Sequence, residues 1–256
     1  MGIDADTAAA ALAQTWQHQR RASPSDGWTV RDGGVFAMVT GVREATLNGV
    51  WAERVDPDPD IVARLLDRVA AAGLPYCLQL RPGGSPALAR LAMARGMSDA
   101  GQGSPLMVLE DPSRLTRAQQ VPGLEIRQLA PEDAKLHVAA AAAGFEATEE
   151  VFRQLVTPAL LRAPGVRCYL GEADGQPVTT GLGVTVGPFV AIFDISTTPA
   201  DRGHGYGAAI SARAVSDGLA AGASWSWLQS SPAGYGVYER LGFRTVASWQ
   251  VWLSGS

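Results

Sequence analysis

The stretch from Ile195 to Ala208, ISTTPADRGHGYGA, constrains the fold of this chain more than any other. It begins as the end of an apolar strand, passes through a proline turn, and places Gly203, Gly205 and Gly207 at alternate positions before a helical pattern starts. Glycine lets backbone N–H groups turn inward, and it lets a bulky anion approach without a Cβ in the way. Unpaired N–H groups at a helix start, together with the positive end of the helix dipole, favour phosphate. The stretch therefore predicts a strand–loop–helix unit that binds a diphosphate through main-chain amides.

Two other kinds of phosphate-binding loop are excluded by their own requirements. A P-loop needs a lysine directly after its last glycine, and this stretch contains no lysine. A dinucleotide-binding loop has the spacing G-x-G-x-x-G and an acidic residue about 20 positions later. Here the spacing is G-x-G-x-G, and Ser224–Gln229 contains no acid. The pattern that remains is R-x-x-G-x-G-A, and for this loop taken alone the alternative is a flexible helix start without a ligand.

A second segment strengthens the interpretation of the loop. The residues ISTTPADRGHGYG follow the pattern of a strand end and then x-Pro-x-x-Arg-Gly-x-Gly-x-Gly. After the next expected strand, Tyr235–Phe243 (YGVYERLGF) follows the pattern A-x-x-l-Y-e-k-l-G-F. In this order the two patterns are similar to those of the GNAT superfamily of N-acyltransferases, which the chain resembles over residues 123–256.

The resemblance implies a mixed α+β fold of the α/β class. In this fold a mixed, mostly antiparallel sheet is flanked by helices, and two of its strands are parallel and splay apart. Residues 189–197 and 224–230 correspond to these two strands. The resemblance also implies that the pantetheine arm of coenzyme A (CoA) bonds to the unpaired backbone of the splayed strands as a surrogate strand.

The chain is expected to contain two domains. A polar stretch over residues 111–123 carries two prolines and shows no periodicity, which is typical of a boundary. We therefore predict a smaller α/β lobe over residues 1–115 and the GNAT acetyltransferase domain over residues 122–256. The first lobe matches no catalytic motif, but its strand and helix-plus-turn segments resemble a degenerate half of the same fold. An unrelated α/β cap is the alternative.

The resemblance assigns the binding of CoA mainly to main-chain atoms. The backbone of Ile195 and Thr197 would contact the pantetheine, and the amides of residues 203–208 would hold the diphosphate with Arg202 beside them. Two positions depart from the family pattern, because Ser231 stands where the family often has Asn and Gly234 where it often has Ala. The CoA-binding residues expected on this basis are Ile195, Ser196, Thr197, Arg202, Gly203, His204, Gly205, Tyr206, Gly207, Ala208, Ser230 and Ser231.

The chemistry of the family is direct attack of an amine on a thioester, which requires a proton donor for the departing thiolate. Tyr238 matches the position of the family's usual acid, and a phenol with a pKa of roughly 10 keeps its proton at neutral pH. Asp194 is the carboxylate inside the strand 189–197 and is the candidate base, although a structural, hydrogen-bonded aspartate is an equal alternative. A packing role is the alternative for Tyr238. Cys168 and His137 are interpreted as packing residues rather than as a nucleophilic pair.

Composition excludes several classes of protein. The chain has 256 residues and a formal net charge of −4, which argues against a nucleic-acid partner, since nucleic-acid binding needs a basic surface. No apolar run approaches the roughly 20 residues that span a bilayer, so no membrane partner is expected. Two cysteines and three histidines provide neither a disulfide framework nor a metal site. Acids precede the first apolar stretch and arginines follow it, the reverse of a secretory signal, so a bacterial cytoplasmic location is expected.

The function expected from the resemblance is that of an N-acetyltransferase. Acetyl-CoA is the expected co-substrate, without a metal, and the acceptor is a primary amine on a small molecule or a peptide. One alternative is a non-catalytic acyl-CoA-binding regulatory protein, which keeps the loop but needs neither Tyr238 nor a base. Another is a structural tandem that forms a homodimer through its C-terminal strand.

Overall fold

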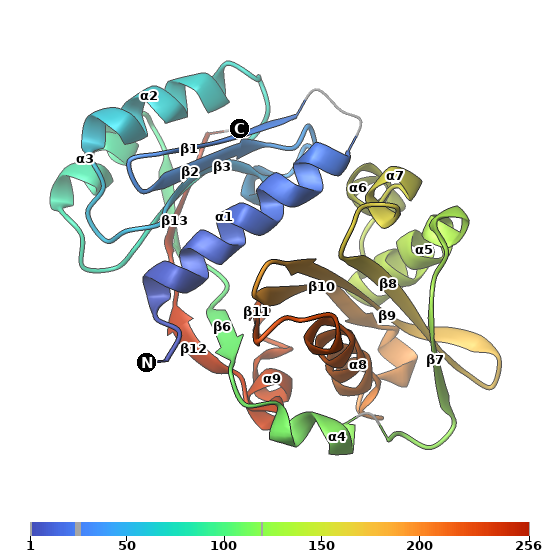
Figure 1. Ribbon diagram of the computed structural model, residues 1–256. Coiled ribbons are helices and arrows are strands. Elements are labelled where there is room, and N and C mark those ends of the chain that lie inside the picture. Colours follow the sequence, from blue (N-terminus) through green and yellow to red (C-terminus); the bar gives the residue numbers. More distant parts are fainter. Residues whose placement is uncertain (1, 24–26, 119, 256) are drawn as a thin grey trace. The chain divides into compact units, whose positions relative to one another are not determined.

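A computed structural model describes residues 2–23, 27–118 and 120–255. Its contacts divide the chain into two compact units. The C-terminal unit consists of Met1–Ile3 and Leu106–Thr245, and the N-terminal unit consists of Asp4–Pro105 and Val246–Ser256. Each unit is built around one mixed sheet with helices packed on it (Figure 1).

The C-terminal unit contains a seven-stranded sheet in the order β12-β6-β11-β10-β9-β8-β7. Its strands β7 to β10 follow one another as an antiparallel meander, whereas β10 and β11 run parallel and β6 is antiparallel to β11. The bounds of the strands are β6 (Leu106–Leu109), β7 (Leu124–Gln128), β8 (Val166–Ala173), β9 (Gln176–Val186), β10 (Phe189–Thr197), β11 (Trp225–Gln229) and β12 (Arg244–Ala247). This is the mixed, mostly antiparallel sheet that the sequence predicts.

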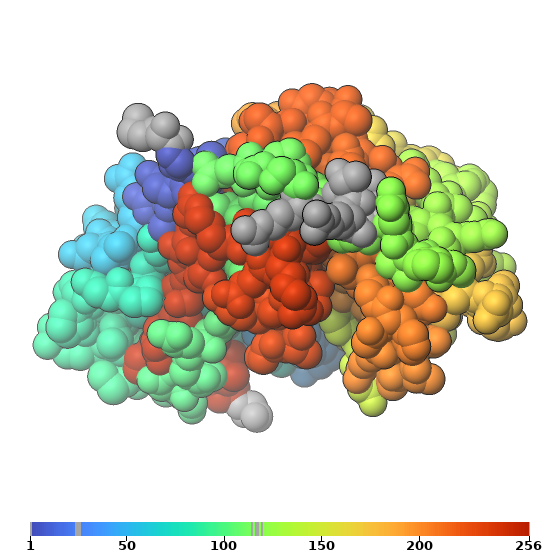
Figure 2. Space-filling model, turned by 90° about the horizontal axis from the view of Figure 1, so that it is seen from below, coloured from blue at the N-terminus to red at the C-terminus, as the bar shows by residue number. Residues whose placement is uncertain are grey.

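Helices cover both faces of this sheet. The main ones are α5 (Ala134–Phe145) and α8 (Tyr206–Ala220), and both contact β9 and β10. Side chains of β10 reach both helices: Ile192 packs in the core with Ile210 of α8, while Ser196, which follows the bulge of the strand, donates a hydrogen bond to the carbonyl oxygen of Ala140 in α5. The remaining helices are α4 (Leu115–Ala118), α6 (Glu149–Leu155), α7 (Pro158–Leu161) and α9 (Tyr235–Leu241). Residues of α8 and α9, orange and red, come to the surface in Figure 2.

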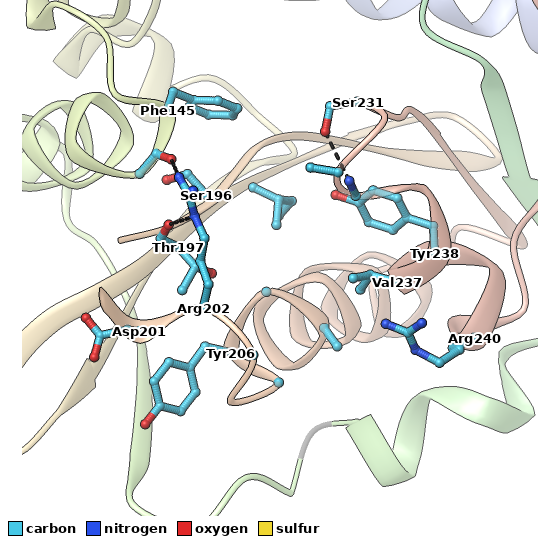
Figure 3. A pocket seen from close by; sticks show the side chains of 18 of the residues that line it. Phe145, Ser196, Thr197, Asp201, Arg202, Tyr206, Ser231, Val237, Tyr238 and Arg240 are labelled. Atoms are coloured by element: carbon cyan, nitrogen blue, oxygen red, sulfur yellow. Dashed lines mark hydrogen bonds between the residues drawn. The ribbon is translucent and has the colours of Figure 1, made fainter. Parts of the chain in front are cut away.

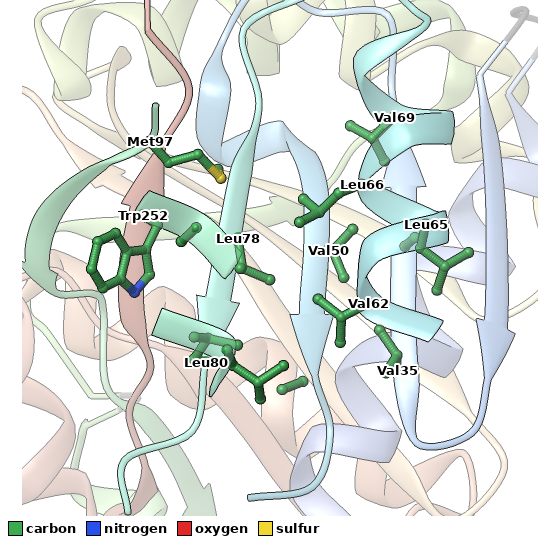
Figure 4. Packing of buried hydrophobic residues seen from close by; sticks show 14 of the residues in the cluster. Val35, Val50, Val62, Leu65, Leu66, Val69, Leu78, Leu80, Met97 and Trp252 are labelled. Carbon is green, nitrogen blue, oxygen red and sulfur yellow. The ribbon is translucent and has the colours of Figure 1, made fainter. Parts of the chain in front are cut away.

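The N-terminal unit contains a six-stranded sheet in the order β1-β2-β3-β4-β13-β5. Its strands are β1 (Trp28–Asp32), β2 (Val35–Val39), β3 (Asn48–Ala52), β4 (Cys77–Leu80), β5 (Ser98–Gln102) and β13 (Gln250–Leu253). Its helices are α1 (Ala5–Ala22), α2 (Pro59–Ala70) and α3 (Pro86–Ala94). The apolar stripe of α2 packs on β2, β3 and β4 to form the core shown in Figure 4.

The two units repeat one arrangement. In the N-terminal unit β3 and β4 are parallel and joined through α2, and in the C-terminal unit β10 and β11 are parallel and joined through α8. The second strand of each parallel pair then has an antiparallel partner from a distant part of the sequence, β13 beside β4 and β6 beside β11. This repetition agrees with the expectation that the first half is a GNAT-like half.

The division into units differs from the expected domains, 1–115 and 122–256, in where it places the strands β6 and β13. The expected domains leave β6 with the first half and β13 with the second, whereas the contacts assign each to the other unit. The physical reason lies in the strand edges. After pairing with its parallel partner, β4 or β11 still has one edge with unpaired N–H and C=O groups, and an antiparallel strand, β13 or β6, bonds to them.

Several element bounds also differ from the prediction. The sequence pattern predicts a single strand over residues 244–252, but the structure has two strands there, β12 and β13, one in each sheet. The pattern also predicts one helix over residues 148–163, but the helix is interrupted before Pro158 and forms α6 and α7, because proline is tolerated at a helix start and not in its interior. Strand β5 was not predicted, since its residues, SDAGQ, are mostly exposed and lack an apolar pattern. Within the residues described, no helix is long and apolar enough to cross a membrane.

Candidate active site

The strands β10 and β11 separate after a short stretch of pairing. Their parallel register covers Phe189 to Ala191 of β10, and the remaining six residues of β10 extend beyond it. Along its other edge β10 stays paired with β9 as far as Thr197, apart from a bulge between Phe193 and Ser196. The last residues of β10 therefore present one backbone edge that no strand pairs with, as the splayed strands of the predicted fold require. At the end of this edge Nε of Arg202 donates to the carbonyl oxygen of Thr197 at 3.4 Å.

The glycine-rich loop connects β10 to α8. Gly203 and Gly205 have φ angles of 88° and 85°, in the left-handed region that favours glycine. Gly205 is the N-cap of α8 and makes no side-chain capping bond. The first-turn amides of an α-helix have no acceptor within the helix, so this helix start presents donors for an anion. This loop conformation is the one that the sequence analysis expects for a diphosphate site.

A pocket of about 760 Å³ lies where the open edge of β10, the loop and α9 converge. Figure 3 shows Ser196, Thr197 and Arg202 on one side of it and Ser231, Val237 and Tyr238 on the other. It collects nearly all of the predicted site residues, namely Ile195, Ser196, Thr197, Arg202, Gly203, Gly205, Tyr206, Gly207, Ala208, Ser231 and Tyr238. Residues far apart in the sequence thus meet in one cavity.

Three predicted residues do not line this pocket. His204 turns back to the loop, where its Nδ1 lies 3.1 Å from the carbonyl oxygen of Asp201 and its ring stacks on Tyr206. Ser230 is fully buried and donates to the carbonyl oxygen of Ser231 at 2.8 Å. Asp194 lies on the α5 side of β10 and is described below.

Arg202 is engaged by helix α5. Its Nη2 donates to the carbonyl oxygen of Gly144 at 2.9 Å and to Oε2 of Glu146 at 3.0 Å. Glu146 is the C-cap of α5, in a left-handed conformation, so the guanidinium supports the end of this helix. The side chain that the sequence places beside the diphosphate is therefore already neutralised by a carboxylate.

Tyr238 extends from α9 into the pocket and is itself mostly buried, with 8% of its surface exposed. Burial raises the pKa of the phenol to about 12, against a smaller lowering by the hydrogen bond with Ser211. Its ring meets Phe243 edge-on, with the ring centroids 5.8 Å apart. A Cβ added at Gly234 would lie 3.0 Å from Cε2 of Tyr238, so this departure from the family pattern leaves room for the ring. The phenol is held in its protonated, donating form.

Asp194 forms a buried cluster with His137 of α5. Its Oδ2 lies 3.4 Å from Nε2 of His137, which is fully buried, whereas 22% of the aspartate side chain is exposed. Asp194 has a φ angle of 52° at the β10 bulge, and such conformations of a non-glycine residue persist where the surroundings hold them. The structure thus gives Asp194 a partner in the helix layer and places it outside the pocket lining, which favours the structural alternative over the role of a base.

The hydrogen bonds of His137 define its protonation. Thr180 donates its hydroxyl proton to the carbonyl oxygen of Tyr169, so its oxygen accepts from Nδ1 of His137, 2.7 Å away. Nε2 faces a carboxylate, which accepts a proton rather than donating one when it is ionised. Burial lowers the pKa of His137, but hydrogen bonds to Asp194 and Cys168 outweigh burial and raise the pKa to about 10. The hydrogen-bond geometry and the direction of the pKa shift together favour the imidazolium form, in which both ring nitrogens carry a proton.

The sequence analysis missed several pocket residues. Phe145, Glu146, Val237 and Arg240 line the cavity without having been named as site residues. Phe145 is 45% exposed and stacks on Phe152. No local signal marks Phe145 and Glu146, because the packing of α5 on β10, with Gly144 against Ser196, brings them to the pocket. Val237 and Arg240 lie within the Tyr235–Phe243 motif.

The structure is similar to solved acetyltransferases over its whole length. A GCN5-related N-acetyltransferase from Kribbella flavida aligns over 100% of this chain and 97% of its own, with a TM-score of 0.69 and 22% identity. One from Sphaerobacter thermophilus covers 86% of this chain and 76% of its own, with a TM-score of 0.61 and 16% identity. A tandem GNAT protein from the clavulanic acid biosynthesis pathway covers 98% and 96%, with a TM-score of 0.57 and 16% identity.

No protein-family model matches the sequence, and no curated protein matches it significantly. The likeness is therefore one of fold. The chain has the GNAT fold, built from two GNAT-like halves.

Proposed function

We propose that this protein is an N-acetyltransferase that transfers the acetyl group of acetyl-CoA to a primary amine. The observation that carries the proposal is the pocket, which joins the unpaired edge of β10, the uncapped start of α8 and the buried phenol of Tyr238 in one cavity. Each of the three features corresponds to one part of a thioester of CoA. The GNAT fold of the chain supports the same assignment.

The three features divide the work of binding the thioester. The amides at the start of α8 hold the diphosphate, each dipole contribution being modest, about 0.3–1 kcal/mol, so that several converge on one group. The open edge of β10 at Ile195 and Thr197 bonds the pantetheine as a further strand would. The thioester then lies near Tyr238, between β10 and α9.

The reaction is a direct transfer. The neutral amine attacks the thioester carbonyl carbon, a C–N bond forms, and the C–S bond breaks. Tyr238 gives its proton to the departing thiolate, the amine loses one proton to solvent, and Tyr238 regains a proton from solvent before the next turnover. A phenol whose pKa is raised stays protonated at neutral pH and is available as this acid. The acceptor is a small-molecule or peptide amine, and the reaction takes place in the cytoplasm of a bacterium.

Product analysis tests this proposal. The protein is mixed with acetyl-CoA and a panel of amines, thiol release is followed, and the acetylated amine is identified by mass spectrometry. We expect thiol release that depends on the amine. Binding of CoA in calorimetry without turnover on a broad panel would instead support a non-catalytic acyl-CoA binder. Absence of CoA binding at millimolar concentration would overturn both assignments.

A further inference from the structure

The pocket contains a cation that the binding of a diphosphate does not require. Two guanidinium groups line the cavity, those of Arg202 and Arg240. Arg202 is paired with Glu146, and the other acid in the lining, Asp201, accepts a hydrogen bond from Thr198. Among the residues that the structure describes, Arg240 has no carboxylate within ion-pair distance. Arg240 is therefore the guanidinium of the lining that no ion pair engages.

The side chain of Arg240 lies along the α9 side of the pocket. The residue lies in the last turn of α9, two positions after Tyr238, and Figure 3 shows its side chain on the same side of the pocket as Val237. Its Nη1 lies 3.3 Å from the place of a Cβ on Gly236, so the guanidinium folds back over the first turn of α9, where a glycine leaves room for it. A guanidinium stays charged and bonds phosphate through two parallel N–H groups.

Arg240 and the phosphate-binding loop occupy different helices. The amides that suit a diphosphate belong to the first turn of α8, whereas Arg240 belongs to the last turn of α9. CoA carries a third phosphate, on the 3′ oxygen of its ribose, which is separated from the diphosphate by the sugar. The loop and Arg240 line the same pocket, so a ligand with two separated phosphate groups suits the two positions.

We propose that Arg240 binds the 3′-phosphate of CoA. The acyl donor is then a 3′-phosphorylated CoA thioester, and donors that lack this group, such as dephospho-CoA and acyl phosphopantetheine, bind more weakly. This inference rests on the proposed function, because it assigns a second contact to the same ligand. Arg240 acts in binding and takes no part in the transfer of the acetyl group.

The test compares two ligands with two proteins. Dissociation constants for CoA and dephospho-CoA are measured by calorimetry on the wild-type protein and on Arg240→Gln. We expect the wild type to prefer CoA by about tenfold, the lower end of what a hydrogen bond to a charged group contributes. In Arg240→Gln the affinity for CoA falls by about the same factor, the affinity for dephospho-CoA stays, and the preference disappears.

Three further variants separate the loss of the 3′-phosphate contact from a general loss of affinity. Arg202→Gln, in the same pocket, is expected to change the affinities for both ligands by the same factor and to keep the preference. Arg153→Gln, on α6 and outside the pocket lining, is expected to change neither affinity. Arg240→Lys is expected to retain part of the preference, because it keeps the charge but not the guanidinium fork.

The outcomes distinguish this inference from the proposed function. Equal affinities of the wild type for the two ligands, or an equal loss of both in Arg240→Gln, would overturn the role of Arg240 while leaving CoA binding intact. If the folded wild type binds neither ligand, the proposed function fails, and the assignment of Arg240 fails with it. Thermal unfolding of each variant shows that the compared proteins are folded.

Discussion

At the scale of single residues, Tyr238 shows how position in the fold prepares a side chain for chemistry. The sequence motif locates a tyrosine near the end of the chain, but burial between α8, α9 and Phe243 is what raises the pKa of its phenol. A phenol in water would already be protonated at neutral pH. Burial extends the protonated state of the Tyr238 phenol to alkaline pH, so the phenol can still donate its proton at the pH values at which amines become neutral.

Replacing Tyr238 tests the acid directly. We expect Tyr238→Phe to lower turnover by roughly 10²-fold, the usual contribution of a general acid, with little change in the affinity for acetyl-CoA. The measurement is steady-state kinetics with calorimetry on the same variant. In the wild type, no loss of rate attributable to Tyr238 is expected below about pH 10, because the pKa of the phenol is about 12. Unchanged turnover would remove Tyr238 from the mechanism.

The second residue-scale prediction concerns His137. Nitrogen-15 NMR of the imidazole is expected to show both nitrogens protonated at pH 8, where an ordinary histidine with a pKa of 6.5 is neutral. Asp194→Asn removes the carboxylate and is expected to lower the pKa of His137 markedly, because burial then acts with less opposition. With three histidines in the chain, His137→Gln assigns the signal. A neutral ring at pH 8 in the wild type would contradict the imidazolium.

The sign of the linked stability follows from the direction of this shift. A histidine whose folded pKa is raised binds its proton more tightly in the folded state. Its contribution to the free energy of unfolding is therefore full below about pH 6.5 and is lost as the pH rises toward about 10. The groups that face His137 from neighbouring strands are Cys168 of β8, Thr180 of β9 and Asp194 of β10.

At the scale of elements, close approach of helix and sheet fixes the position of the phosphate-binding loop. Helix α8 lies against β10 because Gly218 allows contact with Val190, where an added Cβ would lie 2.5 Å from the valine Cβ. At the other end of α8, Gly207 faces Thr197 and Ile195. Small residues at both ends hold the helix start beside the open strand edge.

Gly218→Ala tests this packing. Alanine is a better helix former than glycine by about 1 kcal/mol, yet overpacking against Val190 is expected to outweigh this gain and to cost about 1–3 kcal/mol. The free energy of unfolding, measured with denaturant, should therefore fall. Gly236→Ala in α9 is the matched control, since its added Cβ would meet only the flexible end of Arg240, 3.3 Å away. An increase in stability for Gly218→Ala would show that α8 shifts freely on the sheet.

At the scale of the whole molecule, the two GNAT-like halves differ in the region that follows the first parallel strand. In the N-terminal unit β3 leads into the acidic, proline-rich segment ERVDPDP of residues 53–59, and Asp58 caps α2 by accepting from the amide of Asp60. The carbonyl oxygens of Ala52 and Glu53 accept from Trp249 and Arg81, both at 2.9 Å. These backbone acceptors at the end of β3 are thus occupied by the unit's own side chains.

This difference predicts the stoichiometry of binding. We expect one CoA per chain in calorimetry, bound by the C-terminal unit. Gly205→Asp, which places a carboxylate at the start of α8, is expected to abolish this single event, because the anion and the strained left-handed position both oppose phosphate binding. A second binding event, or binding that survives in this variant, would assign a working site to the N-terminal unit.

Much of the fold and of the site followed from local sequence. The diphosphate loop could be predicted because it is made of consecutive main-chain amides, whose geometry glycine and proline determine within a few residues. Caps such as Asp58 and Ser85 were predictable for the same reason, since each bonds an amide two positions away. The alternating strands of the meander and their Asp-Gly and Gly-Pro turns were equally local.

Only the tertiary structure decided which distant groups meet. Arg202 and Glu146, or His137 and Asp194, are separated by more than fifty positions, and no periodicity relates them. The exchange of β6 and β13 between the two sheets likewise depends on which strand edges remain open after the parallel strands have paired. The sequence by itself thus determined the binding loop and the order of elements, because short-range sterics and hydrogen bonds govern them, while long-range packing decided the charge state and the partners of the side chains around that loop.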